Sequence, residues 1–232
     1  MNIAIFGASG ATGRLLLQRC FAGGHNVTAL VRSPEPFRTL LTRSGMPIES
    51  NESERPSIHI VPGNAFDPEA VRQTVQGADV VLSALGARSL KKEDVLERAV
   101  PLIISAMQET AAQPRPLRRI IVLGAAGALP GALAKQPVWR RWVFQNVVYN
   151  TILKWPIASQ ISQWQNLYRS DLNWTVVMPP MLTNTPAHGN FRIDGEALPR
   201  NGSRISREDV ADFMMQQIDS PQWIRKGVYI TW

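Results

Sequence analysis

The turn that follows the first apolar run constrains this chain more than any other feature of its sequence. Residues 3–6 read Ile-Ala-Ile-Phe, and Gly7, Gly10 and Gly13 come next at three-residue spacing, ahead of an amphipathic stretch. Glycine permits a tight turn, close approach of a ligand to the backbone, and close packing of the following helix against the strand. We therefore expect a strand, a phosphate-binding turn and a helix whose N-terminus faces a pyrophosphate.

Short apolar runs alternate with longer amphipathic stretches along the chain. The runs that we expect to form strands are 3–6, 27–31, 58–61, 80–82, 120–123 and 175–178. The stretches that we expect to form crossover helices are 11–22, 68–75 and 95–111. Near-continuous apolar strands are typical of parallel sheets that are covered on both faces. The pattern predicts an α/β fold of the Rossmann type, with a doubly wound parallel sheet.

Length and composition favour a single NAD(P)-binding domain over residues 1–232. The chain has 232 residues, 44% of them hydrophobic, which is enough for one large core. Residues 33–57 are rich in Ser, Pro and Glu, and they predict a long connection with a short helix at 37–42 and a disordered middle. Residues 179–201 lack regular periodicity, and we expect them to form loops on the substrate side of the sheet.

Charge and residue usage exclude several other classes of function. The formal net charge is +7, but the basic residues are scattered rather than clustered with aromatic residues, so we expect no nucleic-acid partner. No apolar stretch approaches the roughly twenty residues needed to span a bilayer, and we expect no leader before the first strand. The single cysteine, Cys20, favours a reducing compartment and therefore a cytoplasmic location. His25, His59 and His188 have no metal-ligand spacing, so no metal is expected.

The end of the second predicted strand distinguishes between two dinucleotides. A fold that binds NAD usually carries an acidic residue there, which accepts hydrogen bonds from the ribose hydroxyls. This chain has Arg32 and Ser33 instead. A guanidinium beside the ribose pairs well with a 2′-phosphate, so we expect the cofactor to be NADP(H). The alternative is that Arg32 is only a solvated surface charge.

Several motifs run through most of the chain, in the order IAIFGASGATG, VTALVR, PGNAFDPEAVRQTVQGADVVLSALG, LNWTVVMPP and ISREDVADFM. Together they resemble the atypical short-chain dehydrogenase group of NAD(P)H-binding proteins, and most of all its biliverdin-IXβ reductases, also known as NADPH-dependent flavin reductases. The connection 33–57 is longer than the resemblance leads us to expect.

The resemblance implies a set of residues that contact the cofactor. Those around the pyrophosphate are Gly7, Ser9, Gly10, Ala11, Thr12 and Gly13, and Arg32 is on the 2′-phosphate. Those near the adenine are Asn64 and Ala65, and those around the nicotinamide and its ribose are Ser83, Leu85, Gly86 and Pro179. The family usually has Asp where this chain has Asn64, a change that keeps a hydrogen-bond acceptor.

Side chains for acid–base catalysis are missing from the expected positions. Related short-chain dehydrogenases use a Tyr-x-x-x-Lys pair to protonate a carbonyl, but Tyr149 and Tyr168 are each followed four residues later by leucine. Where relatives often carry a serine near the substrate, this chain has Ala125 among glycine and alanine. We therefore expect no catalytic side chain. The candidates for the substrate pocket are Ala125, Trp164 and His188, although Trp164 is equally expected to pack a helix on the sheet.

These expectations lead to two functions of different classes. The first is an NADPH-dependent oxidoreductase that transfers hydride to a flat acceptor such as a flavin, with a tetrapyrrole or a quinone as further possibilities, because such a transfer needs mainly proximity. The second is a redox sensor or scaffold that binds NADP(H) without turnover. Reduction of ketones or sugars would require a tyrosine that the sequence does not offer.

Two further segments have structural interpretations. Residues 139–155 are apolar nearly all round a helix, which favours a buried helix or one covered in a homo-oligomer over one that lies on a membrane. Ser206 and Asp209 resemble the cap of a helix N-terminus.

Overall fold

An eight-stranded sheet forms the centre of the computed structural model, which describes residues 1–46, 56–87 and 89–232. The strand order is β3-β2-β1-β4-β5-β6-β10-β8, and every neighbouring pair is parallel except β10 and β8. The strands of this sheet are β1 (Asn2–Phe6), β2 (Asn26–Val31), β3 (Ile58–Pro62), β4 (Val80–Ser83), β5 (Arg119–Leu123), β6 (Asn173–Met178), β8 (Arg192–Asp194) and β10 (Lys226–Thr231). A second, parallel pair consists of β7 (Met181–Thr183) and β9 (Arg204–Ser206).

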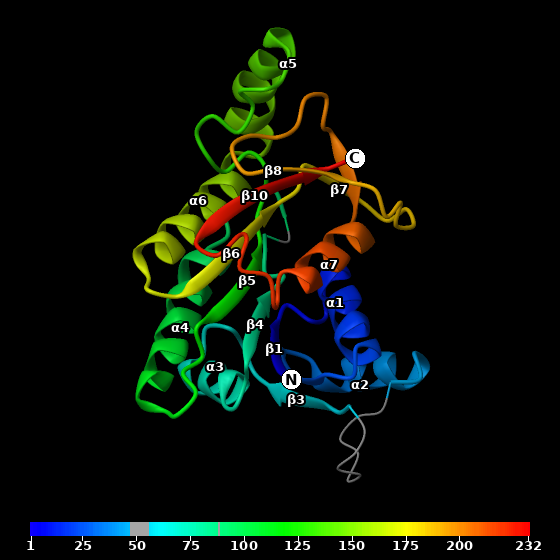
Figure 1. The fold of residues 1–232 in the computed structure, drawn as a ribbon, viewed down its shortest axis with the longest axis vertical. Helices are drawn as coiled ribbons and strands as arrows, with labels where there is room; N and C mark the ends of the chain where they lie inside the picture. The colour runs from blue at the N-terminus through cyan, green and yellow to red at the C-terminus, as the bar shows by residue number, and fades with distance from the viewer. Residues whose placement is uncertain (47–55, 88) are drawn as a thin grey trace.

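Helices cover both faces of the sheet (Figure 1). One face packs against α1 (Ala11–Ala22), α2 (Pro34–Arg43) and α7 (Arg207–Gln216). The other packs against α3 (Pro68–Val75), α4 (Val95–Gln108) and α6 (Lys154–Arg169). Successive residues of β1 alternate between the two layers, with Ile3 and Ile5 in the first core and Ala4 and Phe6 in the second. Because both faces are buried, the central strands are apolar at nearly every position.

The predicted architecture is confirmed. All six predicted strands are present, as are the helices predicted at 11–22 and 68–75. The helix predicted at 95–111 is α4, continued by a 3-10 turn, η1 (Glu109–Ala112), and the short helix predicted at 37–42 is part of the longer α2. Most of the stretch predicted to be disordered within 33–57 lies outside the described residues.

Two predicted segments differ in part from the expectation. Residues 179–201 contain the short strands β7 and β8, and β8 pairs with β10 to extend the main sheet. Strands of three residues are too short to show a period in the sequence. The helix predicted at 139–155, expected to be buried or covered in a homo-oligomer, forms α5 (Val138–Val143), a π-helix, η2 (Phe144–Ile152), and the start of α6. No residue of α5 or η2 is buried, and covering by a second copy stays a prediction. The run of α5 and η2 extends beyond the sheet, at the top of Figure 1.

The chain changes direction across the sheet beside β1. After β1 it proceeds outwards through β2 and β3, and it then returns to β4, on the other side of β1. The connections that leave the carboxyl ends of β1 and β4 therefore diverge, and such a switch point is where doubly wound sheets bind ligands.

Candidate functional site

The glycine turn after β1 lies close to the residue that follows β4, and a hydrogen bond within the turn closes it. Gly7 has φ +81°, and a Cβ there would lie 2.8 Å from the carbonyl carbon of Ala84, which follows β4. The backbone N–H of Gly10 donates to the carbonyl oxygen of Gly7 over 3.0 Å. Glycine at position 7 is therefore needed both for the left-handed conformation and for the close approach of β4.

Helix α1 begins at this turn with an N-terminus suited to an anion. Its N-cap, Gly10, provides no side-chain cap, and its first turn contains no acidic residue. The first amide groups of a helix have no acceptor within the helix, and they lie at the positive end of its dipole. Ala11 and Thr12, in this first turn, line the adjoining cleft. The turn can therefore receive a phosphate group.

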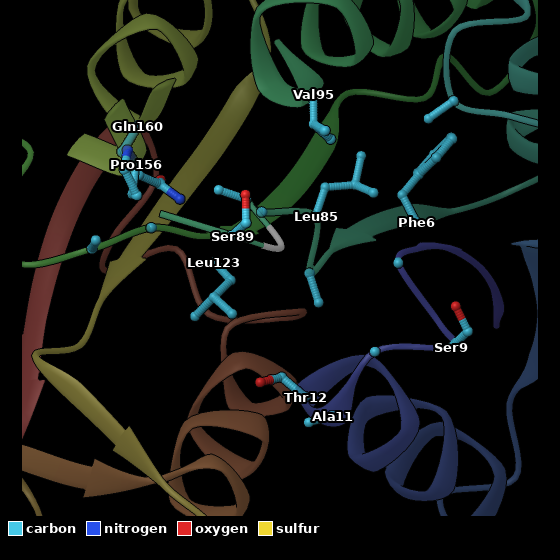
Figure 2. A pocket seen from close by; sticks show the side chains of 18 of the residues that line it. Phe6, Ser9, Ala11, Thr12, Leu85, Ser89, Val95, Leu123, Pro156 and Gln160 are labelled. Carbon is cyan, nitrogen blue, oxygen red and sulfur yellow. The ribbon is translucent and has the colours of Figure 1, made fainter. Parts of the chain in front are cut away.

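A cleft of about 720 Å³ lies along the carboxyl ends of β1, β2, β4 and β5. Figure 2 shows Ser9 and Ala11 on one side of it, Pro156 and Gln160 of α6 on the other, and Leu85 between them. This volume is in the range of cofactor sites. One end is polar and backbone-rich, whereas the end near α6 is mostly apolar.

Arg32 and Asn64 lie at the polar end. Arg32 directly follows β2 and is exposed. No hydrogen bond or ion pair joins it to another residue within the described ranges, so its guanidinium is available to a ligand. The side-chain oxygen of Asn64 accepts a hydrogen bond from the backbone N–H of Phe66 over 3.3 Å, which holds the turn after β3.

The cleft brings together most of the residues that the sequence predicts for the site. Those that line it are Gly7, Ser9, Gly10, Ala11, Thr12, Arg32, Asn64, Ala65, Leu85, Gly86 and Ala125. They come from the loops after β1, β2, β3, β4 and β5, which meet because the strands are parallel and end at one edge.

Three residues expected at the cofactor do not line the cleft. Gly13 is buried, and a Cβ there would lie 2.0 Å from the carbonyl oxygen of Gly7, so its role is in packing. Ser83 is 1% exposed, and its hydroxyl has no hydrogen-bond partner among the residues that the structure describes. Pro179 is buried, and its carbonyl oxygen accepts a hydrogen bond from the backbone N–H of Ala126 over 2.9 Å.

Two of the three candidates for the substrate pocket also lie elsewhere. Trp164 stacks on Tyr168 at 4.9 Å between ring centroids and contacts Trp174 edge-on, so it packs α6 against the sheet. His188 stacks on Trp232 at 3.8 Å, in a loop beside α7. Only Ala125 lines the cleft.

Three polar residues of the cleft were missed by the sequence analysis: Ser89, Gln160 and Arg207. Ser89 follows β4, and its hydroxyl donates to the Glu93 carboxylate over 2.7 Å. Gln160 lies on α6, one helical turn before Trp164 and on the same face. Arg207 is the first residue of α7 and donates to the side-chain oxygen of Asn184 over 2.6 Å. The sequence contains a partial signal for Arg207, because the cap Ser206 places it at a helix N-terminus. That cap is confirmed, since the Ser206 hydroxyl accepts from the backbone N–H of Asp209.

The walls of the cleft contain little that could move a proton. Among the described residues that line it, the ionisable side chains are Arg32 and Arg207, and arginine stays protonated in proteins. Tyr149, in η2 ahead of α6, packs against Gly127 instead, and burial raises the pKa of its hydroxyl.

Comparison with known proteins agrees with this geometry. A family model described as NAD(P)H-binding matches residues 7–221. The chain belongs to this NAD(P)H-binding family. The match begins at the glycine turn and includes every residue named above as lining the cleft.

Solved structures show how widely the fold of this NAD(P)H-binding protein is shared. The anaerobilin reductase ChuY from Escherichia coli O157:H7 is 17% identical, with a TM-score of 0.76 over 100% of this chain and 97% of that one. A candidate NADH-flavin reductase from Streptococcus pneumoniae TIGR4 is 23% identical, with a TM-score of 0.70 over 100% and 99%. A short-chain dehydrogenase/reductase from Veillonella parvula, solved in complex with NADP, is 20% identical, with a TM-score of 0.70 over 100% and 94%. At these identities the likeness concerns the fold.

The residues present fit a dinucleotide. An open helix N-terminus faces the glycine turn, and an exposed arginine follows β2. At Gly86, inside the cleft, a Cβ would meet no atom of the described residues within 4 Å, so the backbone there borders open space. The chain is an NAD(P)H-binding domain with the Rossmann-like fold of oxidoreductases.

Proposed function

We propose that this protein is an NADPH-dependent oxidoreductase that transfers hydride to a flat acceptor, such as a flavin. The observation that carries the proposal is the division of the cleft into a polar end with an unpaired arginine and an apolar end whose described walls hold no acid or base. The first end suits the phosphates of a dinucleotide, and the second suits two stacked rings. Tetrapyrroles and quinones are flat acceptors of the same kind.

The polar end would hold and orient the cofactor. The amides of the first turn of α1 and the hydroxyl of Ser9 would bind the pyrophosphate. Arg32 would pair with the 2′-phosphate through its guanidinium, which favours NADPH over NADH. Asn64 and Ala65 would border the adenine, because they follow β3 beside Arg32.

The apolar end would align the acceptor and exclude water. NADPH supplies a hydride when bound, and a flavin can take it without a protein acid because the charge spreads over its ring carbonyls. Leu85, Leu123, Pro156 and Ile157 would confine the reacting rings to van der Waals contact. Gln160 would be the neutral hydrogen-bond donor at this end. Catalysis would then consist mainly of holding the two rings at about 3 to 3.5 Å.

A second candidate is a protein that binds NADP(H) without turnover, and the absence of acid and base among the described cleft residues favours it too. The reductase and the sensor predict different results for NADPH oxidation. We expect NADPH oxidation by the purified protein to depend on added FMN or riboflavin, with NADPH binding followed by calorimetry on the same preparation. NADPH binding without oxidation by any flat acceptor would favour the sensor.

A further inference from the structure

The helical run formed by α5, η2 and the first residues of α6 presents an unusual outer surface. Val138 is 85% exposed, Trp139 69% and Trp142 61%, and Val143, Val147, Ile152 and Trp155 are exposed as well. We call these seven residues the tryptophan patch. Single exposed apolar side chains are common on protein surfaces, but a row of seven that includes three tryptophans marks a surface that is covered by something else.

The patch lies on the side of the segment that faces away from the protein. At helical spacing, Val138, Trp139, Trp142 and Val143 form one stripe. Phe144 and Tyr149 lie on the other side, where they pack against the core around β5 and β6. The inner face of the segment is therefore already used for folding, and the outer face is free for another surface.

Positive charge accompanies the patch along its length. Arg140 and Arg141 lie in the last turn of α5, on either side of the stripe, and the Arg140 guanidinium lies 5.9 Å from the centroid of the Phe144 ring. At the other end, the ammonium groups of Lys92 and Lys154 lie 5.3 and 5.1 Å from the centroid of the Trp155 ring. Residues 135–155 contain four basic residues, Lys135, Arg140, Arg141 and Lys154, and no Asp or Glu; of the four, Lys135 forms ion pairs with Asp194 and Glu196. The surface that covers the patch should therefore be apolar and negatively charged.

We propose that the tryptophan patch docks this protein onto the surface of an anionic lipid bilayer. Tryptophans flanked by Lys and Arg are typical of helices that lie in the membrane interface, where the rings enter the headgroup region and the cations pair with lipid phosphates. Such docking does not require a spanning segment, and the described residues contain no helix long and apolar enough to cross a membrane. A second copy of the chain fits less well, because a two-fold contact would bring Arg140 and Arg141 against their equivalents, and residues 135–155 contain no Asp or Glu that could pair with them.

The same helical run connects the patch to the cleft. Leu153 lies between Ile152 and the start of α6, and it lines the cleft together with Pro156 and Ile157. Docking through the patch would place this end of the cleft near the bilayer. The docking itself does not depend on the proposed reductase activity, so the two proposals can fail separately.

The test is flotation of the full-length protein with vesicles of phosphatidylcholine, with or without phosphatidylglycerol. We expect the protein to float with vesicles that contain phosphatidylglycerol, to stay unbound with phosphatidylcholine alone, and to be released by high salt. The variant Trp139→Ser/Trp142→Ser should lose more than about tenfold in vesicle affinity, because two large apolar rings are removed. Arg140→Glu/Arg141→Glu should lose binding to a similar extent.

A matched control separates the patch from the net charge. Arg43→Glu/Arg115→Glu changes the charge by the same amount at two exposed arginines that lie outside residues 138–155, and it should keep most of the binding. NADPH affinity, measured for each variant, reports that the fold is intact. The proposal is wrong if the control pair loses as much vesicle binding as the patch pair, or if no vesicle binds the parent protein. It is also wrong if the parent is a dimer that Trp139→Ser/Trp142→Ser dissociates while neither protein binds vesicles.

Discussion

A Cβ atom on Gly13 would lie 2.0 Å from the carbonyl oxygen of Gly7. No side chain can occupy that space, so α1 can begin where it does only if residue 13 has none. The position of the helix N-terminus in the cleft therefore depends on a glycine that does not itself line the cleft.

The variant Gly13→Ala should consequently affect both folding and binding. We expect the free energy of unfolding to fall by about 1–3 kcal/mol, because the added methyl must displace backbone. NADPH binding should weaken as well, since the turn between Gly7 and Gly10 would move. Thermal unfolding and calorimetric titration measure the two effects. Unchanged stability would show that α1 does not pack on the turn as described.

Gly86→Ala is the matched variant inside the cleft. A Cβ there meets no described atom within 4 Å, so the free energy of unfolding should change by less than about 0.5 kcal/mol. The methyl would instead project into the space proposed for the cofactor and weaken NADPH binding. A variant that binds NADPH as tightly as the parent would place the cofactor away from Gly86.

Arg32→Ala tests the preference for NADPH. Losing a charge-assisted contact with a phosphate should cost roughly 1.5–3 kcal/mol, which is about 10- to 150-fold in Kd, and should leave NADH binding nearly unchanged. Arg43→Ala, at the far end of α2, serves as the control and should change neither affinity. Equal losses of affinity for NADPH and NADH would show that Arg32 does not contact the 2′-phosphate.

Ser83→Ala distinguishes a buried hydroxyl from a ligand contact. Since no described group satisfies this hydroxyl, removing it should leave the free energy of unfolding unchanged or raise it by up to about 1 kcal/mol. NADPH affinity should stay within about twofold. As a contrast, Thr110→Val should lower stability by about 1–3 kcal/mol, because the Thr110 hydroxyl accepts from the N–H of Leu117 and donates to the carbonyl oxygen of Met107. A tenfold loss of NADPH affinity in Ser83→Ala would show that the Ser83 hydroxyl does contact the cofactor.

Asp209 should make stability depend on pH. Burial raises the pKa of its carboxyl, but hydrogen bonds from the backbone N–H of His188, the Trp232 indole, the backbone N–H of Gly189 and the Ser206 hydroxyl outweigh this and hold the pKa below its ordinary value. A lowered pKa means that the stabilisation is present above the unfolded pKa of about 3.9 and is lost as pH falls through the folded pKa.

The variant Asp209→Asn measures this contribution. At neutral pH it should lose roughly 1.5–3 kcal/mol of unfolding free energy, because its amide N–H₂ would face N–H donors. The difference from the parent should shrink as pH falls below about 4. Denaturant unfolding across this range checks the prediction, and a difference that stays constant down to pH 3 would contradict it.

The polar end of the cleft could be predicted from the sequence because its residues belong to one turn or directly follow a strand. The residues of the turn from Gly7 to Thr12 are contiguous, and Arg32 follows its strand directly, so parallel strands alone bring them to one edge. The burial of Ser83 could not be predicted, since the last residue of a strand can face either the cleft or the core.

The acceptor end depends on long-range packing. Helical periodicity shows that Pro156, Gln160 and Trp164 share one face of α6. It does not show how far along the edge of the sheet the helix begins. The cleft lies beside the first two, whereas Trp164 packs on Trp174. The exposure of Trp139 was missed for a related reason, because apolarity all round a helix does not reveal which partner covers each face.

The most direct test of the central claim is an anaerobic single turnover in which the NADPH complex of the protein is mixed with FMN. We predict that the absorbance of NADPH and that of the oxidised flavin fall together, and that the rate drops in Gly86→Ala at a concentration of NADPH that leaves the parent saturated. NADPH that stays bound and unoxidised in the presence of FMN would contradict the assignment of this protein as a flavin-type reductase.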